Sequence, residues 1–125
     1  MTLNHITGQV LDAAIRVHSA LGPGLLENVY ETCLAYALRE RGLEVVQQLA
    51  LPVSYRGVPI EVGYRIDLLV DNAVVVEIKA VSKLAPIHRA QLLSYLKLSG
   101  YSVGLLVNFH VTCLANGIVR MVNRL

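Results

Sequence analysis

The residues with the clearest chemical potential are an acid and a lysine two positions apart in an apolar segment. Glu77 and Lys79 fall inside residues 74–81, with only Ile78 between them. Because successive side chains of a strand point to opposite faces, Glu77 and Lys79 point to the same side. A carboxylate and an ammonium in so apolar a strand cost desolvation free energy unless another group compensates.

A second acid, Asp67, lies on the preceding extended segment. Asp71-Asn72 is typical of a hairpin turn, which places Asp67 near residues 76–77 on the neighbouring strand. Two close carboxylates repel, so they raise a pKa or require a cation. A hard cation such as Mg²⁺, held by carboxylates, a backbone carbonyl and waters, fits this arrangement. Lys79 would then contact a phosphate or help deprotonate a water. The alternative is a cross-strand salt bridge on a solvent-exposed face, which the apolar flanking sequence disfavours.

The elements that must position these residues follow from apolar periodicity and from glycine and proline breaks. We expect helices over residues 4–21, 26–41 and 86–99, and strands over residues 43–55, 58–70, 73–81, 101–109 and 118–122. The order ααβββαββ predicts an α/β fold with a mixed β-sheet flanked by helices. The segment 73–81 is the most apolar and should be central, and it should run parallel to 101–109 through a helical crossover. Pro52 indicates an edge or an irregular end in the first strand.

Length and composition are those of one compact unit, a single domain over residues 1–125. Hydrophobic residues make up 54% and charged residues 16%. The apolar runs are shorter than the ~18 residues that a membrane-spanning helix needs, so we expect no membrane association and a sheet buried on both faces. The net charge of +2 permits nucleic-acid binding without arguing for it.

The cysteines and the N-terminus bear on location. Cys33 and Cys113 are far apart, match no zinc spacing and are expected to be reduced. The first residues show no basic segment followed by an apolar stretch, so no secretory signal is expected. Together these features predict a cytoplasmic protein.

Three motifs carry a resemblance to a known family. Asp67 followed by Glu77-Ile78-Lys79 resembles the D-x(n)-(D/E)-x-K signature of the PD-(D/E)XK nuclease superfamily, although Ile66 rather than proline precedes the aspartate. Gln91 and Tyr95, on the helix after the lysine strand, resemble the Q-x-x-x-Y motif of one subgroup. The segment 24–30, Gly-Leu-Leu-Glu-Asn-Val-Tyr, resembles the G-x-x-E-x-x-Y motif that names a small family within the superfamily. The expected elements are also similar to the restriction-endonuclease-like core.

The resemblance implies a role for each matched residue. It implies four metal ligands: the carboxylates of Asp67, Glu77 and Glu27, and the carbonyl of Ile78. Lys79 would position or activate the attacking water, and Gln91 and Tyr95 would orient the substrate phosphate or the lysine. Glu27 has the alternative of an acid favoured at a helix N-terminus. For Gln91 and Tyr95 the alternative is a half-buried helix face, and Tyr30 is equally suited to the core or to supporting the site.

The function that these roles imply is a Mg²⁺-dependent nuclease, with Mn²⁺ as a substitute ion, that hydrolyses phosphodiester bonds of DNA or RNA. DNA is the favoured partner. One alternative is a catalytically inactive nucleic-acid-binding module with the same fold. Another is a protein-interaction module, which the high apolar content favours weakly. A homodimer fits all three accounts, because two sites are needed to cut two strands.

Overall fold

The computed structural model describes residues 2–61 and 63–123. Its main sheet has five strands in the order β1-β4-β5-β6-β7. These strands are β1 (Val45–Ala50), β4 (Arg65–Val70), β5 (Val74–Lys79), β6 (Val103–Asn108) and β7 (Ile118–Val122). β5 pairs with β6 in parallel, and the other neighbouring pairs are antiparallel. The expected mixed sheet, the central position of residues 74–79 and the edge position of the first strand are therefore confirmed.

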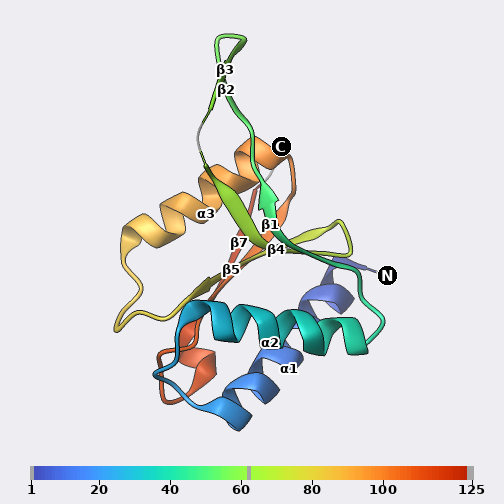
Figure 1. Ribbon diagram of the computed structural model, residues 1–125, viewed down its shortest axis with the longest axis vertical. Helices are drawn as coiled ribbons and strands as arrows, with labels where there is room; N and C mark the ends of the chain where they lie inside the picture. Colours follow the sequence, from blue (N-terminus) through green and yellow to red (C-terminus); the bar gives the residue numbers. More distant parts are fainter. Residues whose placement is uncertain (1, 62, 124–125) are drawn as a thin grey trace.

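Helices cover both faces of this sheet (Figure 1). α1 (Leu3–Leu21) and α2 (Glu27–Glu40) pack against one face, and α3 (Pro86–Ser99) packs against the other. Two hydrophobic clusters result. The larger joins α1 and α2 to side chains such as Val76 and Ile78, and the smaller joins α3 to Val75 and Leu106. Val76 and Ile78 lie in the larger cluster and Val75 lies in the smaller one. Successive side chains of β5 therefore point to opposite faces of the sheet, as expected from the sequence.

The helix ends follow local chemistry. The Thr2 hydroxyl accepts a hydrogen bond from the amide of His5 and caps α1. After α2 the chain turns through Gly42, whose φ of 83° favours glycine because a side chain would be strained there. Pro86 opens α3, where its missing N–H leaves no hydrogen bond unmade.

Two of the expected strands are each divided, which corrects the boundaries drawn from the sequence. Segment 43–55 forms β1 and a separate β2 (Val53–Tyr55), and segment 58–70 forms β3 (Val58–Ile60) and β4. Pro52 lies between β1 and β2 and cannot donate a ladder hydrogen bond. β2 and β3 pair only with each other, as a hairpin that projects from the body of the fold (Figure 1).

The connection between β6 and β7 contains a short 3-10 helix, η1 (Leu114–Gly117). Gly117 packs so tightly against the carbonyl oxygen of Asn108 that a side chain would overlap it. In the described part of the chain, no helix is both long and apolar enough to cross a membrane.

Candidate metal and phosphate site

The site begins where two neighbouring strands part. β4 and β5 pair at Leu68–Val76, Leu69–Val75 and Val70–Val74, and Asp67 and Glu77 occupy the next position on each strand. The amide of Asp67 donates to Oε1 of Glu77 at 3.1 Å, and the amide of Ile78 donates to Oδ2 of Asp67 at 2.8 Å. At this point the main-chain amides donate to side-chain carboxyls instead of to the main-chain carbonyls of the neighbouring strand. These contacts hold the two acidic side chains next to each other.

Glu77 is buried, with 5% of its surface exposed, whereas Asp67 is half-buried. The pKa of the Glu77 carboxyl is raised from 4.5 to about 8. Burial is the largest cause of this rise, and the negative charge of Asp67 is the second. Lys79 acts in the opposite direction but does not offset these effects. The carboxyl of Glu77 is therefore protonated near neutral pH unless a cation binds beside it.

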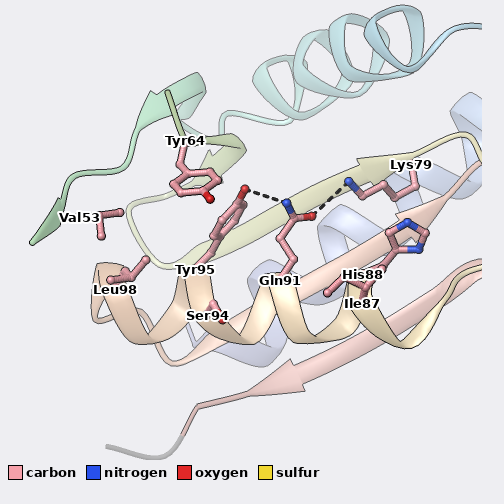
Figure 2. Close-up of a pocket in the computed structure, with 9 residues that line it drawn as sticks. All are labelled: Val53, Tyr64, Lys79, Ile87, His88, Gln91, Ser94, Tyr95 and Leu98. Carbon is pink, nitrogen blue, oxygen red and sulfur yellow. Dashed lines mark hydrogen bonds between the residues drawn. The ribbon is translucent and has the colours of Figure 1, made fainter. Parts of the chain in front are cut away.

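Lys79 faces a pocket between the sheet and α3, of about 640 Å³. Its Nζ atom lies 3.5 Å from Oε1 of Gln91, and Nε2 of Gln91 donates to the hydroxyl of Tyr95 at 3.1 Å. Figure 2 shows this chain of contacts running along one side of the pocket. Burial, followed by the charge of Glu77, raises the pKa of the Tyr95 hydroxyl. The structure therefore brings Gln91 and Tyr95 to the lysine, as their i, i+4 spacing predicts.

In the described part of the chain, Lys79 forms no ion pair with Glu77 or Asp67. Among residues 2–61 and 63–123, the ion pairs within 4 Å both involve Asp12, on α1. Lys79 is half-buried and is directed along the pocket rather than into an ion pair with Glu77 or Asp67. The ammonium thus remains available to a phosphate.

The helix acid that reaches the site is Glu31, which the sequence analysis did not single out. Nε2 of Gln48 donates to Oε1 of Glu31 at 2.5 Å and to Oδ1 of Asp67 at 3.1 Å. Gln48 has a φ of 52°, which is uncommon for a residue other than glycine. It lies opposite Asp67 and is the one position that does not pair in an otherwise continuous register between Val45–Ala50 of β1 and Arg65–Val70 of β4. One amide nitrogen thus lies between two carboxylates. The available signal was that Glu31 lies one helical turn after Glu27.

The structure does not bring Glu27 to the carboxylate pair. Glu27 is exposed in the first turn of α2, and the described residues contain no group of three acids, histidines or cysteines close enough to hold a metal. The three-acid set of Asp67, Glu77 and Glu27 is therefore not assembled here. The role of Glu27 as a ligand stays a prediction.

Tyr30 belongs to the core. Its ring is fully buried and stacks on Phe109, with centroids 4.5 Å apart. Its hydroxyl donates to the carbonyl of Gly22 and accepts from the amide of Leu25. The tyrosine of the G-x-x-E-x-x-Y segment therefore fixes the glycine-rich loop that leads into α2, and so sets where that helix begins.

Asn108, at the end of β6, is a second residue near the site whose role the sequence patterns did not reveal. Asn108 pairs with Lys79 in the parallel register and is 1% exposed. Its side-chain oxygen accepts from the amides of Val81 and His110, and its nitrogen donates to the carbonyl of Val81. Asn108 thus fixes the chain immediately after Lys79. A lone asparagine in a strand carries no pattern that would reveal this role.

A sequence model of the PD-(D/E)XK nuclease superfamily matches residues 4–121. The chain belongs to this superfamily. No curated protein and no solved structure matches it significantly. The superfamily assignment agrees with the D-x(n)-E-x-K residues and with the α/β architecture, and the mixed sheet flanked by helices is consistent with a restriction-endonuclease-like fold. The narrower G-x-x-E-x-x-Y group stays a prediction from its motif.

Nucleases of the PD-(D/E)XK superfamily generally use divalent metals, and the donor set of this chain fits one. Asp67 and Glu77 offer hard carboxylate oxygens, which Mg²⁺ and Mn²⁺ prefer. The raised pKa of Glu77 is itself a sign of fit, because an acid beside another acid is relieved by a cation. The site therefore combines two adjacent carboxyls, of Asp67 and Glu77, with the ammonium of Lys79, which lies on the same side of the sheet as Glu77.

Proposed function

We propose that this protein is a metal-dependent nuclease that hydrolyses phosphodiester bonds in nucleic acid, with Mg²⁺ as its ion and Mn²⁺ as a substitute. The observation that carries the proposal is the pairing of Asp67 with Glu77 where β4 and β5 part, with Lys79 on the adjoining pocket. Superfamily membership implies a nucleic-acid substrate. DNA is the substrate that we expect first.

Four groups would hold the ion or support its ligands. Asp67, Glu77 and the carbonyl of Ile78 are the proposed direct ligands. Glu31 would take part through a water or by displacing the amide of Gln48, which now lies between the two acids. A bound divalent cation would supply charge stabilisation at the phosphate and a more acidic water.

The other side chains act on the substrate. Lys79 would hold a non-bridging phosphate oxygen through its ammonium, which is not committed to an ion pair among the described residues. Only its neutral amine form could take the proton of the attacking water. Gln91 limits the positions of the Lys79 side chain and is itself oriented by Tyr95. A homodimer would supply two such sites for two strands.

Cleavage of end-labelled DNA and RNA, single-stranded and duplex, tests the proposal. Wild type should cut at least one substrate with Mg²⁺ or Mn²⁺ and none in EDTA. Lys79→Ala should slow cleavage by about 10²- to 10⁴-fold, the range for loss of a positioned acid or base. The matched control is Lys97→Ala, an exposed lysine in the last turn of α3. Equal cleavage by wild type and Lys79→Ala would indicate a contaminating nuclease.

A second candidate function is nucleic-acid binding without cleavage. It is favoured by the hydrogen bonds that already occupy both oxygens of Asp67, and by the absence of a three-acid cluster among residues 2–61 and 63–123. In that case affinity for nucleic acid would survive EDTA, and no substrate would be turned over with any divalent ion.

A further inference from the structure

The pocket that Lys79 faces extends well beyond the phosphate site. Lys79 and Gln91 line one end, and Val53, Tyr64 and Leu98 line the other. Figure 2 shows the two ends separated along α3, with the tyrosine rings between Gln91 and the apolar residues. A phosphate needs only the first end, so the second end is left for another part of the substrate.

Tyr64 is the residue that defines this second end. It lies between β3 and β4, where its carbonyl accepts a hydrogen bond from the amide of Leu51 at 2.9 Å. Its ring packs against Tyr95, with centroids 5.9 Å apart and planes tilted by 55°. Tyr95 is buried, whereas Tyr64 is 46% exposed. One side of the Tyr64 ring is thus supported by a fixed aromatic neighbour, and much of the ring remains open to a ligand.

The chemistry of this end suits a nucleobase. Apolar and aromatic side chains are poor partners for a charged sugar-phosphate chain, whereas every base has a π-face that stacks on an exposed aromatic ring. A volume of about 640 Å³ lies within the range of pockets that hold ligands of nucleotide size. Because the bases of a duplex are stacked on each other, only an unpaired or splayed base can enter.

We infer that Tyr64 is a stacking platform for an unpaired base of the strand whose phosphate lies at Lys79, and that the substrate is single-stranded nucleic acid or a frayed end. This inference rests on the proposed function, which assigns the phosphate to Lys79. One site suffices for one strand. Binding at Tyr64 would depend little on which base is present, because stacking involves the face of the base and not the hydrogen-bonding groups at its edge.

The test compares binding of a labelled 12-nucleotide thymidine strand with that of the same backbone without bases, by fluorescence anisotropy with Ca²⁺ in place of Mg²⁺. Tyr64→Ala should weaken binding of the strand with bases by about 5- to 150-fold and leave binding of the abasic strand within about twofold. Tyr64→Phe should bind both strands as wild type does. Tyr64→Leu, which keeps apolar bulk without the π-face, replaces Tyr64→Ala if the latter does not fold. Tyr36→Ala, at an exposed tyrosine on α2, is the matched control.

Three results would overturn the inference. The first is an unchanged affinity of Tyr64→Ala and Tyr64→Leu, and the second is an equal loss with and without bases. The third is a wild type that binds duplex as tightly as single strand. If wild type still cleaves nucleic acid in a Lys79-dependent way, only this inference fails. A wild type that neither binds nor cleaves contradicts the proposed function as well.

Discussion

Asp67 and Glu77 are linked by reciprocal hydrogen bonds between main chain and side chain. The amide of Asp67 donates to the Glu77 carboxyl, and the Asp67 carboxylate accepts from the amide that follows Glu77. These contacts fix both carboxyls on the strands rather than on mobile loops. The two carboxyls are therefore already held next to each other, and a cation that bound between Asp67 and Glu31 would displace the amide of Gln48.

Stability should depend on pH through Glu77. Its pKa is raised from 4.5 to about 8, so the folded chain holds a proton that the unfolded chain releases between these values. The protonated Glu77 carboxyl contributes its full stabilisation of the folded state below about pH 4.5, and this contribution is lost as the pH rises from there through 8. Urea unfolding without divalent ions should show wild type losing free energy of unfolding relative to Glu77→Gln across this window. Parallel pH profiles would refute the assignment.

Glu31 should matter more than Glu27 for metal binding. Glu31 reaches Asp67 through Gln48, whereas Glu27 is exposed one turn earlier on the same helix. Glu31→Gln should lower Mn²⁺ affinity by about 10- to 100-fold, the usual effect of removing a group that supports metal ligands. Glu27→Gln should change affinity by less than about threefold. A larger loss in Glu27→Gln than in Glu31→Gln would instead support the role that the sequence motif implies for Glu27.

Asn108 should be required for stability. Asn108→Ala removes three hydrogen bonds of a buried side chain and leaves the amide and carbonyl of the half-buried Val81 without these partners, so the free energy of unfolding should fall by about 2–4 kcal/mol. Asn116→Ala, at an exposed position on η1, is the control and should change little. Chemical denaturation measures both, and equal stability of the two variants would contradict the role of Asn108.

The hydroxyl of Tyr30 should stabilise the loop before α2. Tyr30→Phe keeps the stacking on Phe109 but removes the hydrogen bonds to Gly22 and Leu25. We expect a loss of about 1–2 kcal/mol in the free energy of unfolding. Amide hydrogen exchange should also become faster over residues 22–26, while Tyr36→Phe should leave both measurements unchanged. Unaltered exchange in Tyr30→Phe would show that the loop is held by other contacts.

Much of the sheet could be predicted from the sequence because its signals are local. The apolar segment 74–79 predicts a central strand, and the Asp71-Asn72 turn sets the register that places Asp67 opposite Glu77. Both turn residues have a φ of 50°, which asparagine and aspartate tolerate better than most residues. The alternation of Glu77 and Lys79 with apolar neighbours likewise follows from strand geometry alone.

The rest of the site depends on tertiary contacts that no local pattern encodes. Gln48 reaches Glu31 and Asp67 only because its backbone takes a positive φ, and glutamine has no marked preference for that conformation. The G-x-x-E-x-x-Y segment left Tyr30 equally suited to the core or to supporting the site, and the structure packs this tyrosine in the core. The pocket at Tyr64 arises because the first and second predicted strands are each divided, which brings the base of the hairpin beside α3.

The central claim is that Asp67 and Glu77 form a divalent metal site, and calorimetric titration of Mn²⁺ and Mg²⁺ tests it most directly. Wild type should bind, Asp67→Asn and Glu77→Gln should each lose binding, and Glu40→Gln, at an exposed acid near the end of α2, should bind as wild type does. Circular dichroism confirms that each variant is folded. Binding that persists in both Asp67→Asn and Glu77→Gln, or a folded wild type that binds neither ion, would contradict the claim.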